Sequence, residues 1–201
     1  MTFYVLRHAD KEAGEFRNPR LPLNDQPISQ VGRDQVLALV EYFRDIPIES
    51  ITVSEYQRTT QTIAGVAVSK ELPITVDSRL NEINIGLLEK LEEETIEHEY
   101  PDFWQAFLAR DRDFTFPNGE SGEAAGHRVY ELFCSLDASR NHILVAHDGL
   151  IRILICRVLG LPTWKRHLFR IELASLTTFE FMPQFNCWAM PGYNISVTSE
   201  K

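Results

Sequence analysis

Two histidines stand directly after apolar segments, at positions where phosphate chemistry could take place. Arg7 and His8 follow the apolar run 3–5, and His147 follows the apolar run 143–146. A neutral imidazole is a good nucleophile, and an adjacent guanidinium can hold an incoming phosphoryl group in line with it. This pattern predicts attack of a histidine on phosphorus.

An arginine and a glutamate complete this candidate chemistry. Arg58 lies in the first turn of a helix predicted over 58–68, where free backbone N–H groups favour an anion. Glu82 is flanked by apolar residues, including Ile83. Such surroundings raise the pKa of a carboxyl group, so we expect Glu82 to keep a proton near neutral pH and act as a general acid.

Alternating strands and helices must position these side chains. The spacing predicts strands at 3–5, 50–54, 75–76 and 142–147, and helices that begin at Ser29, Arg58, Glu120 and Asp148. Two further strands are predicted between Leu168 and Met182, joined around Ala174 and Ser175. This order indicates an α/β fold, a three-layer αβα sandwich with a mainly parallel sheet. Ligands bind beyond the carboxyl ends of the strands in such sheets, where both histidines are placed.

The middle of the chain has a different character. It contains the acidic run Glu92 to Glu94, and Phe103, Trp104 and Phe107 follow at helical spacing. We interpret residues 88–118 as a helical insertion over the site, with the aromatic side chains forming its own core. The whole chain, 1–201, is then a single domain with an inserted lobe.

Five motifs, in this order along the chain, resemble those of the histidine phosphatase superfamily, the phosphoglycerate mutase-like family. The matching segments are Arg7-His8, Ser54 to Thr62 with Arg58, Leu80-x-Glu82-x-x-x-Gly86, Gly119-Glu120-Ser121, and His147-x-Gly149-x-Ile151-Arg152. The resemblance covers essentially the whole chain. It implies the same α/β fold and a phosphoryl-transfer enzyme.

The resemblance also implies a mechanism. His8 would attack phosphorus through Nε2 to form a phosphohistidine, while Glu82 protonates the leaving alkoxide and then activates water. The phosphate oxygens would be bound by the cationic groups of the site and one amide: Arg7, Arg58, a protonated His147 and the backbone N–H of Asp148. No metal or other cofactor is expected.

The chain departs from the family pattern at several positions. Ala9 replaces a glycine after His8, and Lys11 lies in a region where mutases often carry Thr and Asn. Asp148 stands where glycine is common, and its carboxylate could point to solvent or repel a polyanionic substrate. We interpret Arg152, four residues into its predicted helix, as an ion-pair partner rather than a substrate ligand.

Charge and cysteine content limit which partners and which cellular compartment we expect for the protein. The net charge of −9, without a basic stripe, argues against nucleic-acid binding. Three widely separated cysteines, Cys134, Cys156 and Cys187, favour a reducing compartment over a disulfide framework. With no secretory signal and no apolar run of about 18 residues, we expect a cytoplasmic protein with no membrane partner. The sequence is compatible with either a monomer or a homodimer.

These observations favour a metal-independent phosphomonoester phosphatase acting on a small phosphorylated metabolite, with inorganic phosphate as a product. A bisphosphoglycerate-dependent phosphoglycerate mutase is the alternative within the enzyme class, although the chain is short for that role. A non-catalytic protein that binds a phosphorylated ligand on the same fold is the alternative outside it. The presence of all five site residues, Arg7, His8, Arg58, Glu82 and His147, argues against that third hypothesis.

Overall fold

A six-stranded sheet forms the centre of the protein in the computed structural model, which describes residues 1–197. The strand order is β3-β2-β4-β1-β5-β6. The strands are β1 (Thr2–Arg7), β2 (Ser50–Val53), β3 (Ile74–Val76), β4 (His142–Ala146), β5 (Ser175–Met182) and β6 (Cys187–Ser196). The ladders among β1, β4, β2 and β3 are parallel, and those that add β5 and β6 are antiparallel. The mainly parallel sheet expected from the sequence is confirmed.

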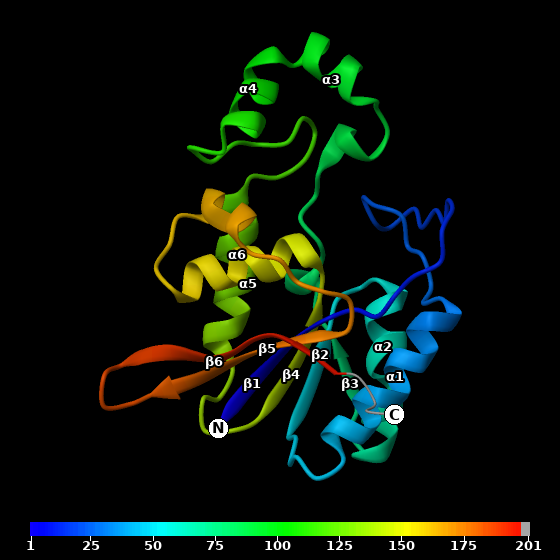
Figure 1. The fold of residues 1–201 in the computed structure, drawn as a ribbon, viewed down its shortest axis with the longest axis vertical. Helices are drawn as coiled ribbons and strands as arrows, with labels where there is room; N and C mark the ends of the chain where they lie inside the picture. Colours follow the sequence, from blue (N-terminus) through cyan, green and yellow to red (C-terminus); the bar gives the residue numbers. More distant parts are fainter. Residues whose placement is uncertain (198–201) are drawn as a thin grey trace.

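Helices cover both faces of this sheet (Figure 1). The pair α1 (Gln30–Phe43) and α2 (Gln57–Ser69) packs on one face, and the pair α5 (Gly122–Ser135) and α6 (Asp148–Val158) packs on the other. Each pair buries its own apolar cluster against the sheet, so the molecule has three layers. Every residue of β4 is buried, as a central parallel strand requires.

Hydroxyl side chains fix the starts of two of these helices. Ser29 precedes α1 and accepts a hydrogen bond from the Gly32 N–H, and Ser121 precedes α5 and accepts one from the Ala124 N–H. Each cap satisfies one of the backbone donors that a helix leaves free at its N-terminus. The predicted starts at Ser29 and Glu120 therefore lie within two residues of the observed ones.

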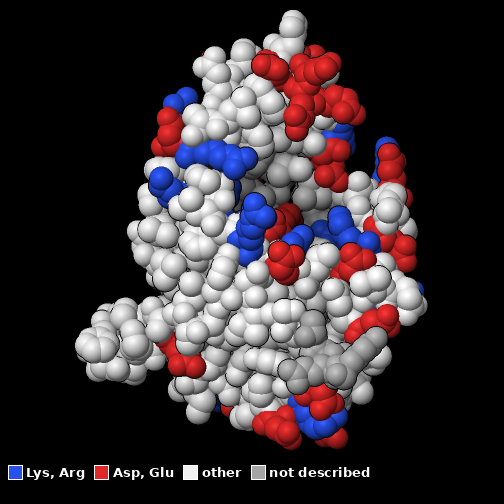
Figure 2. All heavy atoms as spheres, in the orientation of Figure 1, with Lys and Arg blue, Asp and Glu red and all other residues white. Residues whose placement is uncertain are grey.

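The chain between β3 and α5 rises from the carboxyl end of the sheet as a separate lobe (Figure 1). It contains short 3-10 turns at Ser78–Leu80 and Gly86–Glu89, then α3 (Glu93–Glu99) and α4 (Pro101–Ala109). Acidic side chains gather on the outer surface of the lobe near α3 (Figure 2). Within residues 1–197, no helix is both long and apolar enough to cross a membrane.

Of the two strands predicted between Leu168 and Met182, the second is confirmed as β5 and the first is wrong. Residues 169–174 form no strand; instead Thr163–Leu168 is a 3-10 helix and Ala174 adopts a left-handed φ of 54° just before β5. The partner of β5 is β6, further along the chain. Sequence reasoning missed β6 because it contains Pro191 and Gly192, which are typical of edge strands and bulges.

Candidate active site

The adjacent strands β1 and β4 bring the two histidines together. Arg7 at the end of β1 is in register with Ala146 at the end of β4, and the His8 N–H donates to the Ala146 carbonyl at 3.0 Å. The imidazole rings of His8 and His147 lie 5.2 Å apart between centroids. Both side chains are buried, with 4% and 1% exposed. We call Arg7, His8, Arg58, Glu82 and His147 the strand-end site.

His8 presents an unprotonated Nε2. Its Nδ1 lies 2.8 Å from the Ala9 carbonyl oxygen, which can only accept, so Nδ1 carries the hydrogen. Burial, and after it the charge of Arg58, lowers the pKa of His8 to about 3. The ring is therefore neutral near pH 7, and its free lone pair lies on Nε2, as nucleophilic attack requires.

His147 is also neutral, which corrects the expectation that it is protonated. Arg58 Nη2 donates to Nδ1 at 3.1 Å, so the hydrogen of the ring lies on Nε2, 2.8 Å from Ser54 Oγ. Burial, and then the charge of Arg58, holds the pKa of His147 well below its usual range. Both ring nitrogens are occupied by protein groups, so His147 orients Arg58 in this arrangement.

The two arginines of the site have N–H donors that are not used in hydrogen bonds within the protein. Arg7 Nη1 donates to the Ile171 carbonyl, and Arg58 Nη1 donates to the Asn24 carbonyl at 3.0 Å. The guanidinium of Arg58 also lies 4.3 Å from the centre of the Tyr56 ring. The Nε groups of Arg7 and Arg58 are buried without a hydrogen-bond partner among the described residues. Buried N–H groups without partners are costly, and an anion would satisfy them.

Glu82 lies at the N-terminus of α6, beside His147. Its carboxylate accepts the N–H groups of Gly149 at 3.1 Å, Leu150 at 2.9 Å and its own neighbour Ile83 at 2.8 Å. Burial is the largest cause that raises the pKa of Glu82, and these backbone donors work in the opposite direction. The carboxyl group thus caps a helix and also holds its proton to a higher pH than a free glutamate does.

Two glycines of the sequence motifs let the backbone approach closely. Gly86 has a φ of 55°, and a Cβ there would lie 2.0 Å from the Pro117 carbonyl oxygen. A Cβ at Gly149 would lie 2.9 Å from Glu82 Oε1. A larger residue at Gly86 would displace backbone in the loop that carries Glu82 or in residues 117–119, and one at Gly149 would push against the Glu82 carboxylate, which explains both glycines.

The carboxylate of Asp148 is paired with arginine side chains rather than exposed alone to solvent. Its carboxylate forms a two-point ion pair with Arg152, with Nε 2.8 Å from Oδ1, and lies 3.9 Å from Arg7 Nη1. Arg152 is therefore an ion-pair partner, as its position suggested. The first backbone N–H of α6, that of Asp148, has no partner among the described residues, whereas Gly149 and Leu150 donate to Glu82.

Sequence reasoning missed the residues that hold the Glu82 loop in place. Arg128 donates to the Glu82 carbonyl at 3.3 Å and to Glu120 at 2.7 Å, and Glu120 accepts the Asn84 N–H at 2.8 Å. The Gly-Glu-Ser motif gave the only signal for Glu120, and no signal singled out Arg128. Ser54, at the end of β2, was quoted as part of a motif but received no role.

The methyl group of Ala9 does not crowd the site, because Ala9 is fully buried in the cluster beneath α1 and α2.

The aromatic side chains of the lobe, including Phe103 and Phe107, pack against one another and against the main core. Figure 2 shows basic side chains around a hollow between the lobe and the sheet domain. Within residues 1–197, no group of three or more His, Cys, Asp and Glu side chains is placed to hold a metal ion.

Comparison with known proteins agrees with this geometry. A sequence model of the histidine phosphatase superfamily (branch 1) matches residues 3–194. The chain belongs to the histidine phosphatase superfamily. It is 26% identical over 200 residues to the probable phosphoglycerate mutase GpmB of Citrobacter koseri, which covers 98% of this chain and 92% of that protein.

Solved structures of this superfamily have the same fold. The mycobacterial glucosyl-3-phosphoglycerate phosphatase superposes with a TM-score of 0.78 at 26% identity, covering 97% of this chain and 99% of the other. The alpha-ribazole phosphatase of Shigella flexneri superposes with a TM-score of 0.79 over the full length of both chains, at 22% identity. These family relationships support an enzyme of the phosphatase and mutase type.

Proposed function

We propose that this histidine phosphatase family member hydrolyses phosphomonoesters of small metabolites through a phosphohistidine on His8. One observation carries the proposal. Near the free Nε2 of a neutral His8, the half-buried Arg7 and the buried Arg58 each hold a buried Nε–H that has no partner among the described residues. A phosphoryl group would satisfy both donors and lie within reach of the nucleophile.

The residues of the strand-end site supply each step of the reaction. His8 Nε2 forms a bond to phosphorus while the bond to the leaving oxygen breaks, and the proton of Glu82 passes to that oxygen. The ionised Glu82 then takes a proton from water, whose oxygen displaces His8 from phosphorus and releases inorganic phosphate. Arg7, Arg58 and the Asp148 N–H bind the non-bridging oxygens.

His147 takes part through Arg58. An arriving phosphate dianion competes with His147 for the Arg58 guanidinium and offsets the positive charge that lowers the pKa of the imidazole. With this positive charge offset, Nδ1 of His147 takes up a proton from solvent, and its N–H donates to a phosphoryl oxygen in the transition state. The neutral His147 paired with Arg58 is then the resting arrangement.

A second candidate reaction is phosphoglycerate mutase activity, which the name of the Citrobacter koseri relative supports. A mutase must shield its phosphoenzyme from water, whereas the phosphatase structure at 26% identity supports hydrolysis. The two reactions separate when 3-phosphoglycerate is supplied with its bisphosphate primer. Isomerisation without phosphate release would replace the phosphatase proposal, and release of inorganic phosphate would support it.

Hydrolysis of phenyl phosphate with and without a chelator tests the proposal and its independence of metals. We expect turnover that survives the chelator and is lost in His8→Ala. Loss of wild-type turnover on chelation would contradict a metal-independent reaction. Retained phosphate binding without turnover of any phosphomonoester would favour the non-catalytic binding protein instead.

A further inference from the structure

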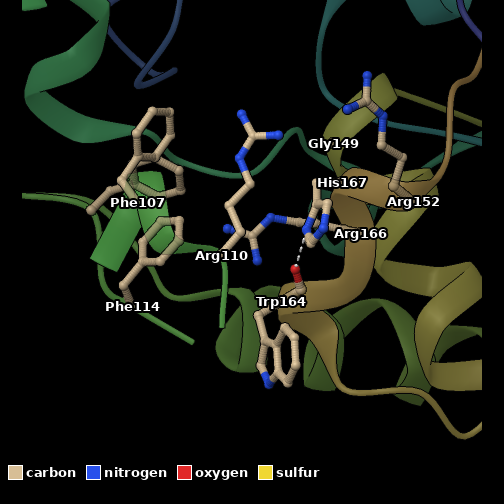
Figure 3. A pocket seen from close by; sticks show the side chains of 9 residues that line it. Phe107, Arg110, Phe114, Gly149, Arg152, Trp164, Arg166 and His167 are labelled. Atoms are coloured by element: carbon tan, nitrogen blue, oxygen red, sulfur yellow. Dashed lines mark hydrogen bonds between the residues drawn. The ribbon is translucent and has the colours of Figure 1, made fainter. Parts of the chain in front are cut away.

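A cavity lies next to the strand-end site, between the lobe and α6. It has a volume of about 240 Å³ and is lined by basic and aromatic side chains, chiefly Arg110, Arg152, Arg166, His167, Phe107 and Trp164. We call this cavity the arginine pocket. In Figure 3, Phe107 and Phe114 stand on the lobe side, and Arg152, Arg166 and His167 come from α6 and the 3-10 turn that follows it.

The arginine pocket is connected to the strand-end site. Gly149, whose N–H contacts Glu82, lines the pocket directly. A neighbouring opening of about 360 Å³ shares Arg110, Arg152 and His167 and is also lined by Arg7. A substrate with its phosphoryl group on His8 could therefore extend into the arginine pocket without leaving the cleft.

Positive charge in the pocket is only partly balanced by the protein. Arg166, with 13% of its side chain exposed, lies 3.7 Å from Asp113, and Arg152 is paired with Asp148. Arg110 has no carboxylate partner among the described residues. The adjoining opening adds Arg170, and Glu172 is its one acidic lining residue. In a protein with a net charge of −9, this local excess indicates an anion site.

The surroundings of individual groups agree with this interpretation. Burial lowers the pKa of Arg166, and the positive charges of Arg110 and Arg152 lower it further, so these cations repel one another. His167 Nδ1 lies 2.9 Å from the Trp164 carbonyl oxygen and must carry the hydrogen there, which leaves Nε2 free of that contact. An anion between these groups would relieve the repulsion.

The aromatic wall limits what else can enter. Phe107, Phe114 and Trp164 supply apolar surface, and the volume of about 240 Å³ lies below the range of roughly 300–1,000 Å³ typical of pockets for drug-sized ligands. The larger cavity under the loop 15–24 has mixed charges, from Glu15, Arg17, Glu89 and Lys90, and offers no comparable anion site.

We propose, building on the phosphatase function above, that the arginine pocket binds a second anionic group on the leaving portion of the substrate. The substrate class is then a small phosphomonoester with an apolar or planar portion that carries a carboxylate or a second phosphate. Arg110, Arg166 and His167 hold the second anion, Arg152 stays paired with Asp148, and Phe107 and Trp164 contact the apolar portion.

Equilibrium binding of non-hydrolysable benzylphosphonates tests this subsite independently of turnover. The probes are (carboxybenzyl)phosphonates with the carboxylate at the meta or para position, the matching neutral carboxamides, and xylylene bisphosphonates. We expect at least one anionic probe to bind wild-type protein about tenfold more tightly than its carboxamide, as one charge-assisted hydrogen bond would provide. A preference for the bisphosphonates alone would identify the second anion as phosphate.

Arg110→Gln should abolish this tenfold preference, because Arg110 is exposed and has no ion pair to lose among the described residues. Arg112→Gln is the matched control: this side chain is 62% exposed, pairs with Asp111 and does not line the pocket, so the preference should remain. Thermal melting of both variants checks that they fold.

Each outcome separates the subsite from the proposed function. Equal binding of anionic and neutral probes would overturn the subsite, while hydrolysis of phenyl phosphate would leave the phosphatase function standing. A preference that disappears in Arg110→Gln, in a protein without turnover, would support the subsite and overturn the phosphatase function. Failure of every phosphonate to bind would overturn the subsite, and the phosphatase function would fall with it only if phenyl phosphate is not hydrolysed either.

Discussion

The strand-end site and the arginine pocket lie side by side but are built differently. In the strand-end site, the backbone of parallel strands fixes each side chain, and buried groups hold one another, as Arg58, His147 and Ser54 do. In the arginine pocket, Arg110 comes from the exposed end of α4 and carries no ion pair among the described residues. This difference supports our proposals that the strand-end site carries out the reaction and that the arginine pocket selects the substrate.

The largest effect should come from removing the nucleophile at the centre of the strand-end site. His8→Ala should lower kcat for phenyl phosphate by a factor of about 10⁴ or more, because no other group can form the covalent intermediate. His98→Ala, which removes an exposed imidazole from α3, should leave kcat unchanged. Comparable turnover in the His8 variant would contradict the covalent mechanism.

Glu82→Gln separates the role of an acid from that of a helix cap. The amide oxygen can still accept the Leu150 and Ile83 N–H groups that Glu82 Oε1 accepts, whereas the amide NH2 would face the Gly149 N–H, so the melting temperature should fall by only a few degrees. We expect kcat to fall by about 10²- to 10³-fold for an alkyl phosphate and much less for 4-nitrophenyl phosphate, whose leaving group needs no proton. An equal loss for both substrates would exclude general acid catalysis.

The pH profile of the same variant sharpens this test. Burial raises the pKa of Glu82, so the protonated acid persists to higher pH than a free carboxyl group, and the wild-type rate falls as pH rises through that value. The alkaline limb should disappear in Glu82→Gln. A limb that persists in the variant would have to arise from another group.

A smaller effect is expected at Ser54, the residue whose role sequence reasoning missed. Ser54→Ala removes the oxygen that His147 Nε2 contacts at 2.8 Å and leaves a buried N–H without a partner. The loss should be about tenfold in kcat/KM. Ser69→Ala, which deletes a hydroxyl bonded only within α2, is the matched control, and an equal change in both variants would show that Ser54 has no special role.

A further effect of the strand-end site concerns stability rather than rate. His8 has a folded-state pKa of about 3, below the ordinary value of 6.5. The unfolded chain therefore binds a proton at this histidine before the folded protein does, so the free energy of unfolding is highest above pH 6.5 and decreases as pH falls toward 3. Between pH 7 and pH 5 this histidine should cost about 2 kcal/mol of unfolding free energy. Urea titrations of wild type and His8→Asn should show that the variant loses this part of the dependence. Equal slopes would mean that His8 is not buried as a neutral group.

The sequence allowed the strand-end site to be predicted because its residues lie beside apolar strands, and parallel strands place their carboxyl ends together. Position relative to β1, β2 and β4 was enough to predict that His8, Arg58 and His147 lie close together. The neutral state of His147 was not predictable, because it depends on contacts with Arg58 and Ser54 that only packing creates.

The arginine pocket left no pattern in the sequence. Arg110, Arg152 and Arg166 come from α4, α6 and a 3-10 turn, so their distance depends on how the lobe meets the sheet domain. The role of Arg128 was not predictable either, because its contact with the Glu82 loop joins residues that are 46 positions apart in the chain. The strand at 168–174 was wrongly predicted because alternation alone does not reveal the left-handed turn at Ala174.

The most direct test of the account is to trap the covalent intermediate. Enzyme mixed rapidly with a phosphomonoester, quenched in alkali and digested should yield a peptide that carries a phosphoryl group on Nε2 of His8. The phosphopeptide should form at least as fast as steady-state turnover and be absent from His8→Ala. Release of inorganic phosphate at the full rate, with no phosphohistidine at any time point, would contradict the central claim.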